Sequence, residues 1–196
     1  MVTYSDVARR SRSAGAALRR NLSAMLESVE SHARAVQEFG LKVGTVTARV
    51  GDARDAKGSG IKKNSISCIV TSPPYSIALD YVENDEHALE ALGTDAEGLR
   101  SIMTGVRGNN AKEKMALYNE DMQEVFRQVA WALKPGGATA LVIGDATVDG
   151  REITTVETMA QWAEAAGLRR ERSIKKIVFG LYNVMKDERI LIFRKP

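Results

Sequence analysis

Apolar side chains recur at three-, four- and seven-residue spacings along two long stretches of the chain, which is the pattern of amphipathic helices. The first stretch covers residues 6–39 and the second covers residues 111–133. A third helix is expected over residues 154–166, because Thr154 and Glu157 can form a capping box at its start. The longest periodic segments of the chain therefore predict three helices.

Short apolar runs rich in β-branched residues lie between these helices and after the last of them, and predict strands. The runs cover residues 45–50, 66–71, 138–143, 173–179 and 188–194. Strands that alternate with helices indicate an α/β domain with a mostly parallel sheet. The last strand follows a short connection, so we expect it to run antiparallel at an edge of the sheet. Residues 93–110 are glycine-rich and weakly periodic, and we expect a long mobile loop or a pair of frayed turns there.

The composition is that of an ordinary soluble protein with one domain. The 196 residues carry a formal net charge of +3, and basic side chains crowd residues 9–20 and 169–176. Each cluster fits a nucleic-acid contact and a solvated face equally well. Cys68 is the only cysteine, and we expect it in the core. The chain shows no signal peptide and no membrane-length apolar run, so we expect a cytoplasmic protein.

The tetrapeptide Ser72-Pro73-Pro74-Tyr75 directly follows the strand predicted over residues 66–71, where ligands bind in open α/β sheets. It arises by chance in about one chain per thousand of this length. An exocyclic amino nitrogen of a base is a poor nucleophile, because its lone pair is delocalised into the ring. Ser72 Oγ and the Pro73 carbonyl can accept both amino hydrogens and free that lone pair, and Tyr75 can stack on a flipped base. The sequence therefore predicts methyl transfer to a base amino group by positioning, without a metal.

Thr71-Ser72-Pro73-Pro74-Tyr75 resembles the catalytic motif of DNA methyltransferases that act on exocyclic amino groups, in the form associated with cytosine N4. Further segments are similar to strand ends and later strands of that family: Val50-Gly-Asp-Ala-Arg54, Leu133-Lys-Pro-Gly-Gly137, Val142-Ile-Gly-Asp145 and Glu188-Arg-Ile-Leu-Ile192. The resemblance implies a Rossmann-like S-adenosylmethionine methyltransferase fold and site-specific methylation of DNA, as in restriction–modification systems. It favours cytosine N4 over adenine N6, because adenine-specific relatives more often carry Asp or Asn in place of Ser72.

The resemblance also implies roles for single residues. Those expected to bind the cofactor are Gly51, Asp52, Ala53, Ser72 and Pro73. Position in the sequence, and not the resemblance, suggests four substrate contacts. Asp80 and Tyr81 lie a few residues past the turn and are candidates to line the base pocket, although helix starts often look like this, and Arg100 and Arg107 are candidates for contacts to the target strand. An Asp after a strand is also a common turn residue or helix cap, and we interpret Asp145 in that way. His32 and His87 have no partner at metal-ligand spacing, which favours packing or surface roles.

No segment of the sequence matches the glycine-rich loop that grips the methionine end of the cofactor in this family. Gly58-Ser-Gly60 follows no apolar strand, and Gly144 has no second glycine two residues on. We therefore expect a helical segment over residues 1–39 and a partial catalytic domain over residues 40–196 that lacks the first strands. Such a domain would expose strand edges and apolar faces. Either a second polypeptide carries the loop, or self-association completes the sheet. A split methyltransferase with a partner subunit is favoured over a truncated or rearranged enzyme, and the N-terminal helix is a candidate contact.

Two other functions stay open. Methylation of an RNA base is one, because similar turns also serve RNA methyltransferases; no RNA-binding module is visible in the sequence, which favours DNA. The other is a non-catalytic subunit that binds nucleic acid or a partner after losing the cofactor site. The intact Ser-Pro-Pro-Tyr turn argues against such a loss, because a disused site has no physical need for it.

Overall fold

The computed structural model describes residues 13–77, 79–148, 151–176 and 185–196. The chain divides into two compact units, Met1–Ala48 and Arg49–Pro196, and each is described by itself. The predicted division between residues 39 and 40 stays a prediction.

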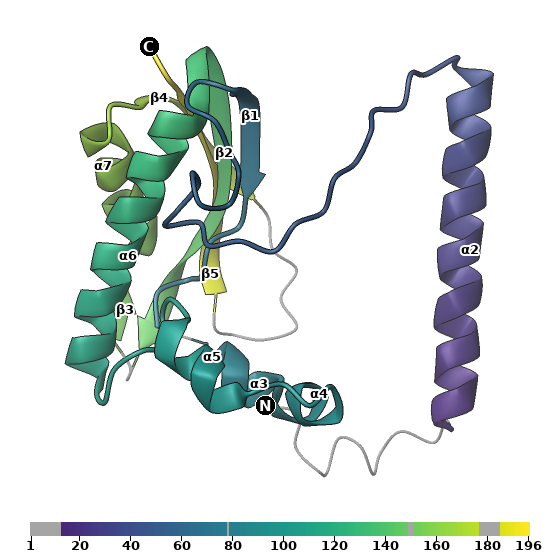
Figure 1. Cartoon of the computed structure of the whole chain (residues 1–196), viewed down its shortest axis with the longest axis horizontal. Helices are drawn as coiled ribbons and strands as arrows, with labels where there is room; N and C mark the ends of the chain where they lie inside the picture. The colour runs from purple at the N-terminus through teal and green to yellow at the C-terminus, as the bar shows by residue number, and fades with distance from the viewer. Residues whose placement is uncertain (1–12, 78, 149–150, 177–184) are drawn as a thin grey trace. The chain divides into compact units, whose positions relative to one another are not determined.

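The described part of the first unit contains one long helix, α2, over Ala14–Glu38 (Figure 1). The Ser13 hydroxyl caps it by accepting a hydrogen bond from the backbone N–H of Ala16 at 3.3 Å. The predicted helix is confirmed from residue 14 onward, and its first predicted residues, 6–12, lie outside the described ones. Large apolar side chains of this helix are more than half exposed: Leu18, Leu22, Met25, Leu26 and Val29.

The predicted strand over residues 45–50 is wrong. The chain has no regular secondary structure from residue 41 to residue 52, and Val46 is 91% exposed. β-branched residues favour a strand only where a neighbouring strand pairs with their backbone and a surface covers their side chains. No described strand pairs with this segment, so the local pattern had nothing to stabilise it.

The second unit is built on one sheet. Its strands are β1 (Ile66–Thr71), β2 (Leu133–Val148), β3 (Arg151–Ile153), β4 (Arg169–Lys176) and β5 (Met185–Arg194). Their order is β1-β2-β5-β4, with β3 paired to β2. β1 is parallel to β2, and β5 is antiparallel to both β2 and β4. The predicted α/β architecture is confirmed, but the expectation of a mostly parallel sheet is wrong for the described residues, because only the β1–β2 pairing is parallel. The antiparallel strand β5 also lies inside the described sheet, between β2 and β4, and not at its edge.

Two helices, α6 (Ala111–Ala132) and α7 (Thr155–Ala165), lie side by side on one face of the sheet (Figure 1). Their apolar sides pack on β2 and β5 to form the core; its largest buried side chains are Tyr118, Met122, Phe126, Leu141, Ile143, Met159, Leu191 and Phe193. Both helices match their predictions. Burial of this stripe supplies most of their stability, since amphipathic helices depend on tertiary packing.

The capping box predicted for α7 is wrong. The Thr154 side chain makes no capping hydrogen bond; instead the Asp145 carboxylate accepts from the backbone N–H of Val156 at 2.9 Å. Glu157 pairs with Arg170 of β4 at 3.0 Å. Asp145 thus has the structural role expected of it, as the cap of a helix that begins ten residues later.

The other face of the sheet carries the side chains that alternate with the core residues. Val70 of β1 is 73% exposed, and Cys68 is exposed as well, so the expectation of a core cysteine is wrong. Cys68 and Val70 pair with Ala138 and Ala140 of β2, and successive side chains of a strand point to opposite faces. Cys68 therefore lies on the face that α6 and α7 do not cover, in the strand that ends the described sheet.

Residues 93–110 are not one long loop as predicted. They contain α5 over Ala96–Ile102, and two shorter helices precede it, α3 (Tyr81–Asn84) and α4 (Glu86–Ala91). The Asp95 side chain caps α5 by accepting from the backbone N–H of Gly98 at 2.9 Å. These three helices gather beyond the carboxyl end of β1 (Figure 1). Within the part of the chain that the structure describes, no helix is both long and apolar enough to cross a bilayer.

Candidate active site

The Ser72-Pro73-Pro74-Tyr75 turn begins at the residue after β1, as predicted. The Pro74 carbonyl accepts two hydrogen bonds, from the Tyr118 hydroxyl at 2.8 Å and from the backbone N–H of Ser76 at 3.1 Å. Ser76 ends the turn with a positive φ of 58° and is buried. The turn is therefore held by a fully packed tyrosine of α6 as well as by its own prolines.

Gly105 explains how a second segment can approach this turn. A Cβ at Gly105 would lie 2.9 Å from the Ser76 carbonyl oxygen, and Gly105 itself has a φ of +85°. Both facts require glycine, since other residues would clash and rarely adopt that backbone conformation. The segment around Gly105 thus packs directly against the end of the turn.

The hydroxyls of the turn form a chain that ends on β5. Ser72 Oγ donates to the Tyr75 hydroxyl oxygen at 3.4 Å, and the Tyr75 hydroxyl donates to Glu188 Oε1 at 3.0 Å. Ser72 is exposed, Tyr75 is half-buried and Glu188 is 7% exposed. Burial raises the pKa of Tyr75, and the hydrogen bond to Glu188 raises it too, against the opposite effect of Ser72. Sequence reasoning missed Glu188 in this role, because only the fold brings it to the turn.

A cavity of about 510 Å³ lies beside the turn and collects the residues predicted to bind the cofactor. Gly51, Asp52 and Ala53 line it together with Ser72 and Pro73. Most of the remaining wall is apolar and comes from α5, α6 and the loop between them: Leu99, Ile102, Met103, Met122, Val125, Phe126 and Val129. The prediction that these two sequence segments share a site thus agrees with their position, while their cofactor role stays a prediction.

Asp52 is held by Arg54. Its Oδ1 accepts from the Arg54 backbone N–H at 2.8 Å and from Nε at 3.0 Å, and its Oδ2 accepts from Nε at 3.1 Å and Nη2 at 2.6 Å. These side-chain hydrogen bonds lower the pKa of Asp52 and raise that of Arg54. A carboxylate has about four lone-pair directions, so Arg54 occupies most of the accepting capacity of Asp52.

Arg54 belongs to a larger group that we call the Asp121 cluster, made of Asp52, Arg54, Thr104, Arg107 and Asp121. Asp121 lies on α6, is 6% exposed, and accepts from Arg54 Nη1 at 3.0 Å, Arg107 Nη2 at 2.7 Å and Thr104 Oγ1 at 2.8 Å. Arg54 Nη2 also donates to the Ile102 carbonyl at 3.0 Å. The cluster thereby ties the segment that carries Asp52 to α6 and to the loop after α5.

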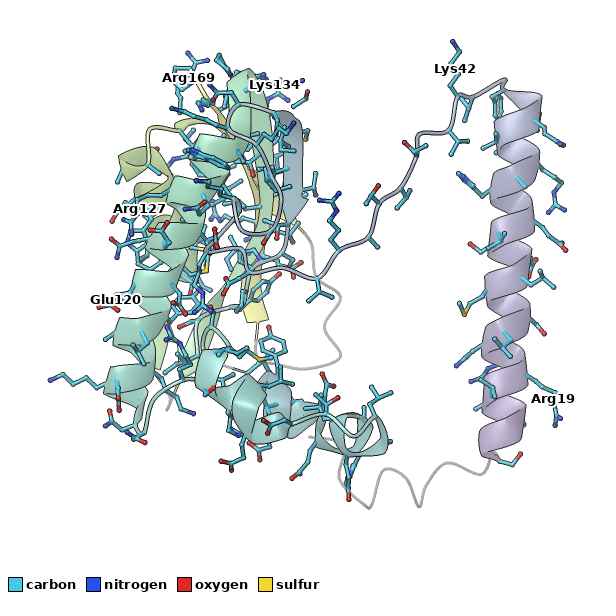
Figure 2. All side chains as sticks on the ribbon, in the orientation of Figure 1. Arg19, Lys42, Glu120, Arg127, Lys134 and Arg169 are labelled. Carbon is cyan, nitrogen blue, oxygen red and sulfur yellow. The ribbon has the colours of Figure 1, made fainter. Side chains whose placement is uncertain are left out.

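Asp121 was not found from the sequence, although a signal was present. It lies three residues after Tyr118 and four before Val125, inside the apolar stripe of α6. A carboxylate on a buried helix face needs hydrogen-bond or ion-pair partners. Charged residues on the exposed face of the same helix do not. Figure 2 shows Glu120 and Arg127 of the same helix pointing away from the sheet, into solvent.

Three of the four residues predicted to contact substrate have side-chain partners within the fold. The Asp80 carboxylate caps α3 by accepting from the backbone N–H of Glu83 at 3.0 Å, and it also pairs with Arg100. Tyr81 is the first residue of α3, and Arg107 belongs to the Asp121 cluster. None of the four lines the cavity. Their contact with substrate stays a prediction.

Two arginines of the second basic segment, on β4, form salt bridges. Arg170 binds Glu157 and Glu164 at 3.0 and 2.8 Å, and Arg169 binds Glu171 at 3.3 Å. These pairs lower the positive potential of this edge strand, which favours a solvated face over a nucleic-acid contact. Of the first basic segment, residues 9–12 lie outside the described residues.

No protein-family model and no curated protein matches the chain. Among solved structures it is similar to the PvuII DNA methyltransferase (cytosine-N4-specific), with TM-score 0.51 and 13% identity over 76% of this chain and 48% of that one. A protein of Thermus thermophilus described as a candidate DNA modification methylase, solved with S-adenosyl-L-methionine, gives TM-score 0.47 and 24% identity over 75% and 52%. The chain spans about half the length of each. The first likeness confirms the expected Rossmann-like methyltransferase fold.

Proposed function

We propose that this chain carries the base-binding half of an S-adenosylmethionine-dependent methyltransferase that methylates the exocyclic amino group of a DNA base, cytosine N4 in particular. The observation that carries the proposal is the position of the Ser72-Pro73-Pro74-Tyr75 turn. It follows a parallel strand of the sheet, where ligands bind in such folds, and it lines a cavity together with Gly51, Asp52 and Ala53. The likeness of fold to a cytosine-N4-specific enzyme supports the same function.

The cavity fits part of the cofactor. Its volume of about 510 Å³ is in the range of small-molecule sites, and its apolar wall with a few polar groups suits an adenosine. When bound, the cofactor supplies an activated methyl group on a sulfonium. Asp52 would accept from the adenosine, and because Arg54 already donates to both of its oxygens, one Arg54 donor would be exchanged for the ligand. The described residues include no glycine-rich loop at the end of a strand for the methionine end.

The turn positions the acceptors for the base. Ser72 Oγ is exposed and lines the cavity, so a base amino group can reach it. Of the two proline carbonyls, that of Pro74 is taken by Tyr118 and Ser76, while that of Pro73 has no hydrogen-bond partner among the described residues. Ser72 Oγ and the Pro73 carbonyl are therefore the two acceptors for the amino hydrogens, and they draw the nitrogen toward the tetrahedral shape it needs to attack.

The described residues do not contain the glycine-rich cofactor loop, so it comes from elsewhere: from a second polypeptide, from a second copy of the chain or from a further segment of a longer protein. β1 ends the described sheet, and its outer face exposes Cys68 and 73% of Val70. An edge strand with exposed apolar side chains is a template for another strand. A strand carrying the glycine-rich loop and added at β1 would place that loop next to the Ser72 turn, because both would lie at strand ends on the same edge of the sheet.

The test is to incubate DNA with deuteromethyl-labelled S-adenosylmethionine and the chain, alone and together with the polypeptides encoded beside it. Mass spectrometry of the nucleosides should detect labelled N4-methylcytosine, and Ser72→Ala should abolish it. Labelling of the Cys68 thiol should slow when the completing polypeptide binds. Labelled N6-methyladenine would contradict the cytosine assignment, and label in RNA alone would contradict DNA as the substrate. If no preparation binds the cofactor by calorimetry, the enzyme function is wrong.

A further inference from the structure

Three side chains from two distant parts of the sequence form a directed chain of hydrogen bonds. Ser72 and Tyr75 come from the turn after β1, and Glu188 comes from β5, 113 residues from Tyr75. The Tyr75 hydroxyl donates to Glu188 Oε1 at 3.0 Å, and its oxygen accepts from Ser72 Oγ at 3.4 Å. Glu188 is buried and Tyr75 packs against the core, so packing restricts both side chains of the Tyr75–Glu188 hydrogen bond.

The direction of this chain follows from the chemistry of its last member. An ionised carboxylate can only accept hydrogen bonds, whereas a hydroxyl can donate one and accept two. Glu188 therefore makes Tyr75 the donor of their bond. The Tyr75 oxygen is then left as an acceptor, and the Ser72 proton turns toward it. Once the Ser72 proton is committed in this way, both lone pairs of Ser72 Oγ are left for other donors.

We propose that Glu188 is a positioning residue that acts through Tyr75 to hold Ser72 Oγ as a hydrogen-bond acceptor toward the base amino group. The inference rests on the proposed function, in which Ser72 must accept an amino hydrogen. A serine hydroxyl that is free to rotate would spend part of its time pointing its proton at the amino group, which is a repulsive arrangement. Fixing the rotor before the base arrives removes that arrangement.

Orientation, and not acceptance of a proton, is the role that the geometry supports. Ser72 is exposed, so the proton that the amino nitrogen releases on methylation can leave directly to water. The bond between Ser72 and Tyr75 is long, at 3.4 Å, which suits a contact that aligns a hydroxyl better than one that transfers a proton. Burial of the Glu188 carboxylate carries a desolvation cost. In return, the carboxylate can only accept, so it fixes the direction of the Tyr75 hydroxyl; an amide, which can accept or donate, would not.

The first experiment needs only the chain itself. Tyrosines labelled with ¹³C at Cζ are titrated by NMR, and Tyr75→Phe assigns the Tyr75 resonance. Glu188→Gln should lower the pKa of Tyr75, because it removes a negative acceptor that raises this pKa, while burial still acts to raise it. Glu171→Gln, on exposed β4, is the control and should leave it unchanged. An unchanged Tyr75 pKa in folded Glu188→Gln would overturn the inference.

The second experiment uses the active complex. Glu188→Gln keeps the size of the side chain and its capacity to hydrogen bond but no longer fixes the direction, so kcat should fall by about tenfold. KM for the cofactor should stay unchanged, and Glu188→Asp should recover part of the loss. Equal kcat in Glu188→Gln and wild type would overturn the inference while leaving the methyltransferase intact. A Tyr75 pKa that responds to Glu188 in a chain that never methylates DNA would instead overturn the proposed function.

Discussion

The Ser72–Tyr75 turn and the Asp121 cluster both contribute to the wall of the cavity, but different interactions hold them in place. The turn follows a regular strand and is fixed by two prolines and by hydroxyl hydrogen bonds to Tyr118 and Glu188. The segment that carries Asp52 has no strand partner among the described residues, and Arg54 ties it to Asp121 on α6. Backbone geometry therefore positions the wall formed by the turn, whereas ion pairs position the wall formed by the Asp52 segment.

This difference indicates how each wall responds to perturbation. The hydrogen bond between the Tyr118 hydroxyl and the Pro74 carbonyl joins two neutral groups, and the Tyr75–Glu188 bond ends on a buried carboxylate, so salt should affect the turn little. Ion pairs depend on charge state and on exposure, and here Asp52 is half-exposed while Asp121 is buried. Removal of one partner from a buried group of charges is costly, because the other charges stay behind uncompensated. We therefore expect chemistry to depend chiefly on the turn and stability chiefly on the cluster.

The two regions meet in one short segment. Thr104 and Arg107 donate to Asp121, and Gly105 between them passes under the Ser76 carbonyl at the end of the turn. A change in the cluster can therefore shift the backbone of the turn. Turnover, cofactor affinity and the free energy of unfolding should nevertheless respond differently to changes in the two regions.

The largest effect is expected from Ser72→Ala in the active complex. Loss of an acceptor that acts on the reacting nitrogen should lower kcat by about 100-fold or more, by analogy with the loss of one oxyanion-hole donor. Cofactor affinity, measured by calorimetry, should change little, because the hydroxyl is a small part of the cavity wall. Equal loss of turnover and of cofactor binding would show that the turn and the cofactor wall do not have separate roles.

Asp121→Asn should give the next largest effect, on stability. It leaves two arginines facing a neutral amide, and we expect the free energy of unfolding to fall by about 2–3 kcal/mol. This is less than for a fully buried group, because the Arg54 and Arg107 side chains are 23% and 26% exposed. Chemical denaturation measures the change. Glu120→Gln, one residue away and facing solvent, is the matched control and should change it by less than about 0.5 kcal/mol.

If Asp121→Asn lowered the free energy of unfolding no more than Glu120→Gln does, the Asp121 cluster would not contribute to the stability of the fold. Hydrogen exchange over residues 49–60 gives a second readout. These amides should exchange faster in Asp121→Asn, because Arg54 ties their segment to α6.

The sequence predicted one of these walls and not the other for a physical reason. The strand over residues 66–71 and its Ser-Pro-Pro-Tyr turn are local patterns, and both were found. Residues 45–50 show an equally good local pattern but have no partner strand, so the prediction was wrong. The role of Asp121 depends on Arg54, 67 residues away in the sequence, and the role of Glu188 depends on Tyr75, 113 residues away. Pairings across such separations are set by the fold and leave little trace in the local sequence.

The smallest effects are expected in the pH dependence of stability, and here the two regions should respond at opposite ends of the scale. Arg54 lowers the pKa of Asp52 below its usual 3.8, so this pair stabilises the fold above that pH and its contribution is lost as the pH falls further. Burial raises the pKa of Tyr75 above 10.0, so its contribution is present below pH 10.0 and is lost as the pH rises through the raised value. Because Asp52 is half-exposed, its share should stay below about 1 kcal/mol.

The two limbs can be separated with one substitution each. Asp52→Asn should make the acid limb of the stability curve, below about pH 4, shallower and leave the alkaline limb as in wild type, whereas Tyr75→Phe should make only the alkaline limb shallower. Other carboxyls with lowered pKa values and Tyr118 with a raised one keep some slope in both limbs. Urea denaturation across the pH range measures both. If Asp52→Asn also altered the alkaline limb, the shared segment around Gly105 would couple the two regions strongly enough to make them one unit. If each substitution altered only its own limb, the Asp52–Arg54 pair could break without disturbing the hydrogen-bond acceptors on the turn. The proposed exchange of an Arg54 donor for the cofactor requires this independence.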